Sequence, residues 1–203
     1  MTKTVRFIWS MVLILCMFCI GTILADKQHL QNEIIRLHVL ANSDSETDQQ
    51  IKLCVRDAVT AYLENSFGSI TDVEEAKKYI RSHLSEIQIL ANKTLESVGS
   101  RDQASVYLTK EKFGLREYDT FSLPSGVYDS LRIDIGAAEG KNWWCVVFPS
   151  LCIPASSEAF RETAISSGFD DKLAGALSYE DGYEVRFFLL DCFGRLENLF
   201  FSK

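Results

Sequence analysis

The fold of this chain is decided by two adjacent stretches, IIRLHVL (residues 34–40) and ANSDSETDQQ (residues 41–50). The first alternates apolar and polar side chains, which predicts a β-strand with three residues facing inward, Ile35, Leu37 and Val39. After the second stretch, apolar residues recur every three or four positions up to about Phe67, which is the stripe of an amphipathic helix. The acidic stretch therefore marks a strand-to-helix corner.

The corner invites a metal interpretation, because acidic or amide side chains occupy every second position: Asn42, Asp44, Glu46 and Asp48. A calcium loop beginning at Asp44 would need Gly at its sixth position and Glu at its twelfth. The chain has Gln49 and Val55 there instead. The cysteines that follow the N-terminal segment also lack the spacing of a zinc site. We therefore predict no metal ion and no cofactor.

Helix capping explains the corner better. Ser45 and Asp48 have the spacing of a capping box, in which the hydroxyl accepts from an early backbone N–H of the helix. Negative charge is also favourable at a helix N-terminus, by roughly 0.3–1 kcal/mol for each carboxylate. A cap does not explain why so many carboxylates share one turn. Asp44 and Glu46 therefore stay candidates for contact with a partner.

The N-terminus predicts export. Lys3 and Arg6 precede a segment without charges, Phe7–Leu24, and the positive-inside rule keeps the two basic residues in the cytoplasm. We expect residues 1–25 to be a signal peptide or a membrane anchor, and residues 26–203 to form a single exported α+β domain. Ala25 is a mediocre cleavage site, so cleavage and anchoring both remain open; an uncleaved chain would contact the membrane through residues 7–24.

Composition and motifs exclude several classes of function. The formal net charge of −7 would repel a phosphate backbone, so we predict no binding to nucleic acid. A serine or cysteine nucleophile needs a base, and the only histidines are His29, His38 and His83. His38 is predicted on the outer face of its strand, and no hydrolase or nucleotide-binding motif occurs. We therefore predict no catalytic residues; a cell-envelope hydrolase of unknown substrate is the alternative, and a structural envelope protein is a second one.

The rest of the chain completes an α+β pattern. A second amphipathic helix is predicted to begin at Thr71–Asp72 and to stop at Gly99. Short β-type segments follow from residue 104 onward. The expected fold is two amphipathic helices packed on a mostly antiparallel β-sheet, preceded by the N-terminal signal or transmembrane helix.

Two of the β-type segments look like a hairpin. Val127–Ile135 alternates, and Trp143–Phe148 is apolar on both faces, so the second is expected at the centre of the sheet and paired with the first. Residues 154–182 are expected to form a long loop with a helical turn. The C-terminal run EVRFFLLDCFGRLENLF (residues 184–200) fits a strand or a helix in its first half, and we favour a helix.

Cys145 and Cys152 are the one cysteine pair with a plausible geometry, because a turn after Phe148 would bring the chain back. In an exported domain such a pair can oxidise. A disulfide closing this short loop would contribute ~2–3 kcal/mol in the loop-entropy model. Two buried thiols are an equally good interpretation.

Two long motifs resemble a known family. RLHVLANSDS…D…K…VRDAV and GKNWWCVVFP..C, together with a terminal EVRF segment, resemble the stage II sporulation protein R family over residues 34–188. Cys54 and the tail after Phe187 depart from the pattern. The resemblance implies a signalling protein rather than an enzyme, made in the forespore and exported into the space between the forespore and mother-cell membranes. Its implied partner is a membrane-embedded aspartic protease of the mother cell, which then processes pro-sigma-E.

A docking surface for that partner is expected around the hairpin. Specific interfaces use aromatic and Arg anchors inside a polar rim. The candidates near the predicted hairpin are Tyr128, Arg132, Lys141, Asn142, Trp143 and Trp144. Neighbouring residues of a strand point to opposite faces, so at least one of the two tryptophans is expected in the core.

Overall fold

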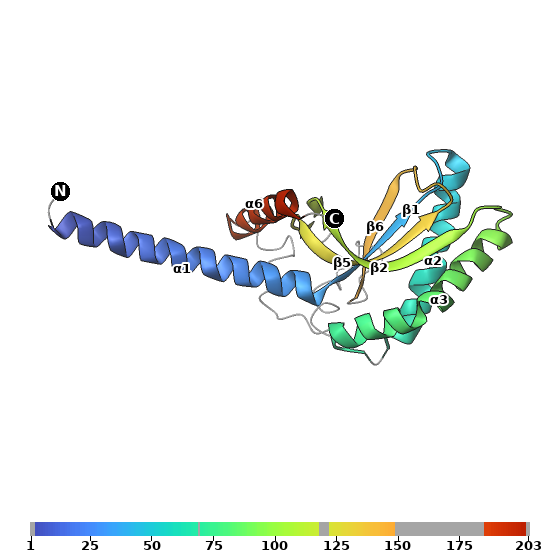
Figure 1. Cartoon of the computed structure of the whole chain (residues 1–203), viewed down its shortest axis with the longest axis horizontal. Helices are drawn as coiled ribbons and strands as arrows, with labels where there is room; N and C mark the ends of the chain where they lie inside the picture. Colours follow the sequence, from blue (N-terminus) through green and yellow to red (C-terminus); the bar gives the residue numbers. More distant parts are fainter. Residues whose placement is uncertain (1–2, 69, 118–121, 149–184, 202–203) are drawn as a thin grey trace.

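The computed structural model describes residues 3–68, 70–117, 122–148 and 185–201, and has an α+β architecture (Figure 1). In chain order its elements are α1 (Lys3–Glu33), β1 (Ile35–Leu40), α2 (Glu46–Ser66), α3 (Val73–Ser97), β2 (Ala104–Phe113), β3 (Arg116–Glu117), β4 (Ser122–Leu123), β5 (Gly126–Ile135), β6 (Asn142–Phe148) and α6 (Val185–Phe200). Four strands form one sheet in the order β2-β5-β1-β6, and β3 pairs with β4. Figure 1 shows α2 and α3 on one side of that sheet.

The sheet is mixed but mostly antiparallel. β1 runs parallel to β5, whereas the β1–β6 and β2–β5 pairs are antiparallel. With α2 and α3 on one face and an apolar helix at the N-terminus, the predicted fold class is confirmed.

Both amphipathic helices begin and end where their sequences predict. Ser45 is the N-cap of α2, and its Oγ accepts from the backbone N–H of Asp48 at 3.1 Å. Asp72 caps α3, accepting from the N–H of Glu75 at 2.9 Å. Gly99 follows α3 with φ of 76°, a left-handed conformation that glycine adopts without steric cost.

The core lies between the two helices and the sheet. The three inward residues predicted for β1 are fully buried: Ile35, Leu37 and Val39. They pack with buried apolar residues that recur at helical spacing along α2 and α3, including Val55, Val59, Leu63, Ala76, Ile80 and Ile87. β1 is buried on both faces, and its three apolar residues on the helix side join the period-3.6 stripes of α2 and α3 in one apolar layer.

The expected hairpin is wrong. β5 and β6 are consecutive in the chain, but β1 lies between them and pairs with both. The connection must therefore cross two strand spacings, about 9.6 Å, instead of turning back within one. It is held over the end of β1, where Ala137 N–H donates to Asn42 Oδ1 at 2.9 Å and Gly140 N–H donates to the Ala41 carbonyl at 2.9 Å.

The central position expected for β6 is also wrong. Among the described strands, β5 and β1 occupy the centre and β6 lies at an edge. Its two apolar faces have separate explanations. Cys145 and Val147 belong to the core beneath the helices, and Val146, on the opposite face, is 1% exposed.

α1 is apolar and exposed over most of its length and enters the domain only at its end. Thr4–Glu33 is the one helix of the described ranges that is long and apolar enough to cross a membrane. Its last turns differ, because Lys27, Leu30 and Gln31 are buried against the domain. α6 confirms the helix favoured for the C-terminal run and lies beside these turns (Figure 1). The loop expected for residues 154–182 lies outside the described residues.

Candidate functional site

The face of the sheet opposite α2 and α3, the second face, carries a row of four residues in register. Tyr107 of β2 lies opposite Arg132 of β5, Arg132 lies opposite His38 of β1, and His38 lies opposite Trp144 of β6. Tyr107 is 47% exposed, and Arg132 and Trp144 are half-buried. The row combines the rings of tyrosine, histidine and tryptophan with a guanidinium on one continuous strip of the sheet.

Buried charges hold this row in place. Glu111 of β2 lies between His38 and Arg132: its Oε2 is 3.1 Å from His38 Nδ1, and its Oε1 accepts from Arg132 Nη1 at 2.9 Å. Arg132 Nε donates in turn to Asp134 Oδ1 at 2.8 Å. We call the five residues His38, Glu111, Arg132, Asp134 and Trp144 the second-face cluster.

The cluster keeps Glu111 ionised. Burial alone would raise the pKa of this carboxyl, which is 8% exposed, but the hydrogen bonds from His38 and Arg132 outweigh it. They lower the pKa of Glu111 from 4.5 to about 2. Glu111 is therefore a fixed negative charge that orients the guanidinium of Arg132.

Aromatic stacking completes the cluster. The Trp144 ring stacks on the His38 ring with centroids 3.5 Å apart, and Phe113 meets Trp144 edge-on at 4.9 Å. The Arg116 guanidinium lies 5.5 Å from the Trp144 centroid. The prediction for His38 is thus corrected. It lies on the face opposite the helices, but it is buried, 5% exposed, because Trp144 covers it.

The pair His38–Glu111 has the form of an imidazole oriented by a carboxylate. Such a pair acts as a general base only when the other ring nitrogen reaches a nucleophile. Within the described part of the chain, buried His38 Nε2 has no hydrogen-bond partner, so no hydroxyl or thiol is in place to be activated. The arrangement is suited to fixing Arg132 and Trp144 in position.

The acidic corner, residues 41–52, fixes the backbone of the β5–β6 connection, and we call this set of contacts the clamp. Asp44 Oδ1 accepts from the backbone N–H of Lys141 at 2.7 Å, and buried Lys52 donates to the Lys141 carbonyl at 3.0 Å. Asp48 accepts from Ser43 Oγ and from Asn42 Nδ2, which lowers the pKa of Asp48. The crowding of polar groups in residues 41–52 therefore has a local structural cause.

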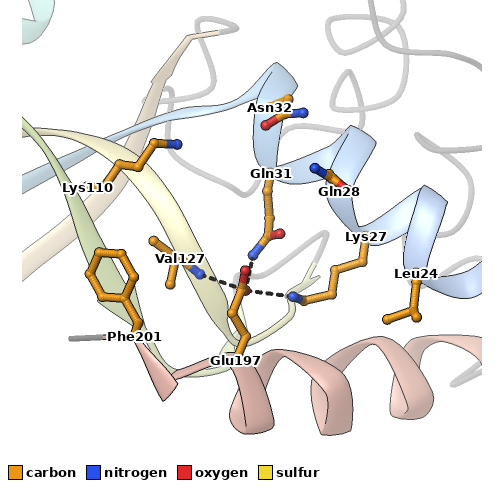
Figure 2. Close-up of a pocket in the computed structure, with 9 residues that line it drawn as sticks. All are labelled: Leu24, Lys27, Gln28, Gln31, Asn32, Lys110, Val127, Glu197 and Phe201. Atoms are coloured by element: carbon orange, nitrogen blue, oxygen red, sulfur yellow. Dashed lines mark hydrogen bonds and ion pairs between the residues drawn. The ribbon is translucent and has the colours of Figure 1, made fainter. Parts of the chain in front are cut away.

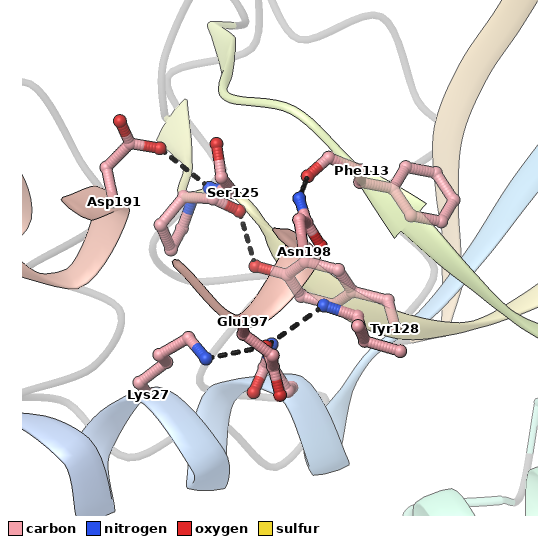
Figure 3. A network of polar contacts seen from close by, with 10 residues as sticks. Lys27, Phe113, Ser125, Tyr128, Asp191, Glu197 and Asn198 are labelled. Atoms are coloured by element: carbon pink, nitrogen blue, oxygen red, sulfur yellow. Dashed lines mark hydrogen bonds and ion pairs between the residues drawn. The ribbon is translucent and has the colours of Figure 1, made fainter. Parts of the chain in front are cut away.

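The other partner-contact candidates are separated by the fold. Tyr128 is fully buried, with its hydroxyl donating to the Pro124 carbonyl at 2.7 Å, so it presents nothing to a partner (Figure 3). Trp143 faces the helices, packed against the core with the Arg56 guanidinium 4.2 Å from its ring. Asn142 is exposed on the second face, two residues before Trp144.

The last two candidates lie at the clamp. Lys141 is exposed, and its backbone, as described above, is fixed by Asp44 and Lys52. Glu46 is exposed in the first turn of α2. The structure therefore gathers Arg132, Asn142 and Trp144 on one face, with Lys141 at the end of the sheet.

Cys145 is disulfide-bonded. Cys152, the partner suggested by the sequence, lies outside the described residues, so the pairing stays a prediction.

A pocket of about 470 Å³ lies between the end of α1, α6 and the strands β2 and β5 (Figure 2). Its most buried polar groups satisfy one another, because Lys27 and Gln31 donate to the same Glu197 oxygen at 2.6 and 2.8 Å. Lys110 at its edge is 3.6 Å from Asp129. We regard the pocket as the junction of α1 with the domain.

Sequence reasoning missed Tyr107 and Glu111. Both lie in a segment recognised as β-type, and a period of two places them on the same face, four residues apart. That signal was available. Their proximity to Arg132 was not, because it depends on the pairing of β2 with β5.

Comparison with known proteins gives a consistent result. A family model described as stage II sporulation protein R matches residues 31–158, a range that contains the four-stranded sheet, α2 and α3. The stage II sporulation protein R of Bacillus subtilis (strain 168) is 37% identical over an alignment covering 80% of this chain and 80% of that relative. No solved structure matches the chain.

Proposed function

Because the chain belongs to the stage II sporulation protein R family, we propose that it is the exported signal that activates a membrane-embedded aspartic protease of the mother cell. A role in sporulation follows from the family itself. The proposal adds that the chain acts from the space between the forespore and mother-cell membranes. It also adds that the activated protease removes the pro-sequence of sigma-E.

The observation that carries the proposal is the row of Tyr107, Arg132 and Trp144 on the second face. Trp, Tyr and Arg are the residue types that dominate binding energy at protein interfaces. Arg132 is held by two carboxylates, Glu111 and Asp134, so little side-chain freedom is lost when a partner binds it. A rigid, partly exposed row of this kind suits protein recognition.

Activation sets a thermodynamic condition on this surface. A ligand shifts a protease from a resting to an active state only by as much as it binds the active state more tightly. Each residue of the row that contacts only the active state contributes to that difference. Loss of one anchor worth about 1.4 kcal/mol would reduce activation tenfold.

Reconstitution tests the function. The full chain, the membrane protease and the pro-sigma substrate would be combined in one membrane preparation, and release of the pro-sequence would be followed with time. We expect processing to require the chain. Equal processing with and without it would refute the function itself.

Variants of the row test the surface separately. Tyr107→Ala removes an exposed ring, and Arg132→Lys keeps the charge but loses the planar guanidinium. We expect each to reduce processing about tenfold, with unchanged circular dichroism. Ile89→Ala on α3 is a matched control, since Ile89 is 54% exposed and lies on a helix that covers the opposite face. Normal processing by both row variants would exclude this surface and leave the function standing.

The hydrolase alternative makes a different prediction. It requires that the chain alone release fragments from purified cell wall, and that His38→Ala abolish the release. We expect no such activity from the wild-type chain.

A further inference from the structure

Helix α6 is amphipathic, but its apolar face is exposed on the outside of the domain and its inner face is mostly polar. Four of its large apolar residues are exposed: Phe188 (61%), Leu196 (50%), Leu199 (76%) and Phe200 (84%). All four side chains point to one face of the helix. At about 100° per residue, Phe188 and Phe200 mark the two edges of a sector of about 120°, and Leu196 and Leu199 point within it. A contiguous apolar helix face on the outside of a domain marks a contact site.

The inner face of α6, by contrast, binds the domain mainly through polar groups (Figure 3). Asp191 accepts from the Ser125 N–H at 2.9 Å, and Asn198 donates to the Phe113 carbonyl at 2.8 Å. Gly194 permits this close approach, because a Cβ there would lie 1.5 Å from the Ser125 carbonyl oxygen. The orientation of α6 is therefore fixed, and its apolar face cannot simply turn inward.

The position of α6 relative to α1 identifies what covers this face. Glu197 lies level with Lys27 and Gln31 of α1, since both donate to it. Figures 1 and 2 show the two helices running in the same direction. Phe188 lies nine residues before Glu197, about 13 Å at 1.5 Å per residue, which is level with residues 18–22 of α1. Those residues belong to the exposed apolar segment that ends at Leu24.

We propose that the apolar face of α6 binds the surface of the lipid bilayer beside α1. In the chain that keeps α1 as its membrane anchor, Phe188 lies at the depth of the acyl chains, because α1 at that level is in the hydrocarbon. Leu199 and Phe200 lie roughly 17 Å further along than Phe188 and about 10 Å beyond the level of Leu24. A tilt of α1 toward α6, within the usual 0–40°, brings them to the boundary between headgroups and acyl chains.

Lipid fits this position better than a second copy of the chain does. Any occupant of the Phe188 end shares its level with the apolar part of α1, where the surrounding medium is hydrocarbon. Arg195, on the flank of α6, has a side chain that is 66% exposed. Its Nε donates to Asp191 at 2.7 Å, which leaves the other guanidinium nitrogens for the phosphate groups of lipids.

Photo-crosslinking of the full chain tests the proposal. The protein would be reconstituted into phosphatidylcholine–phosphatidylglycerol (3:1) vesicles containing a phospholipid with a diazirine in its acyl chain. After irradiation, adducts would be mapped by mass spectrometry. We expect adducts on peptides from α6 as well as α1, and none on the peptide that carries Ile89, an apolar residue of α3 that is 54% exposed.

A double variant, with a check of its fold, separates lipid contact by α6 from lipid contact by α1. Leu199→Gln combined with Phe200→Gln should reduce the α6 adducts at least fivefold and leave those on α1 unchanged. Both side chains are more than three-quarters exposed, so folding should be preserved, and circular dichroism would verify it. Adducts confined to α1, or a chemical cross-link joining α6 of two copies in place of lipid adducts, would overturn the proposal.

Discussion

Glu111→Gln is the sharpest probe of the second-face cluster. The substitution keeps the shape of the side chain and removes its charge. Wild-type Glu111 lies 2.9 Å from Arg132 and 3.1 Å from His38, and is 8% exposed, so its charge is little screened by water. The variant leaves the guanidinium of Arg132 with one carboxylate, Asp134, in place of two.

The pKa of Glu111 gives the magnitude. Lowering it from 4.5 to about 2 corresponds, at about 1.4 kcal/mol per unit of pH, to about 3 kcal/mol of folding free energy. The folded carboxylate stays charged to lower pH than the unfolded one. Its contribution is therefore complete above the unfolded value of 4.5 and is lost as the pH falls toward 2. About 1 kcal/mol should remain at pH 3.

Urea unfolding of the full chain in non-ionic detergent, followed by circular dichroism, measures this. Glu111→Gln should lower the free energy of unfolding by about 3 kcal/mol at pH 7 and by only about 1 kcal/mol at pH 3. Glu64→Gln, at an exposed position of α2, is the matched control and should change little at either pH. An equal loss at both pH values would refute the electrostatic argument, because a packing defect does not titrate.

Three other changes test separate parts of the structure. Leu63→Ala should lower the free energy of unfolding by about 3 kcal/mol, because its side chain is 1% exposed in the core; the same urea titration checks it. Glu197→Gln should accelerate backbone hydrogen exchange in residues 27–33, since the end of α1 is tied to the domain through that carboxylate, and unchanged exchange would count against the tie. Mass mapping without reduction should find Cys145 linked to Cys152; two alkylatable thiols would exclude the bridge.

The helices were predictable because their signals are local. The stripes of α2 and α3, the caps at Ser45 and Asp72 and the stop at Gly99 all depend on residues within one or two turns. The order of the strands was not predictable in this way. Two strands that are consecutive in the chain and joined by a short connection, such as β5 and β6, look like a hairpin in the sequence. Only the pairing of β1 with both of them shows that they are not adjacent in the sheet.

The residues of the candidate site were likewise predictable only where the signal is local. Arg132 and Trp144 could be named from residue type and from the alternation of their strands. His38 and Glu111 could not be joined to them, because their proximity depends on the register of three strand pairs. The burial of Tyr128 was not predictable for a related reason. Alternation gives the face of the strand on which a residue lies, but it does not show that α6 packs against that end of β5.

Under the export proposed above, the insertion of β1 between β5 and β6 has a consequence for translocation of the chain. Leu37 pairs with Leu131 on one side and with Cys145 on the other, so the central strand waits for segments made much later. A topology with such distant partners folds slowly, because long loops must close before any pairing is rewarded. An exported protein crosses the membrane from its N-terminal end as an unfolded chain. The strand order itself therefore delays folding until residues 126–148 have followed, which keeps the leading part of the domain competent for transport.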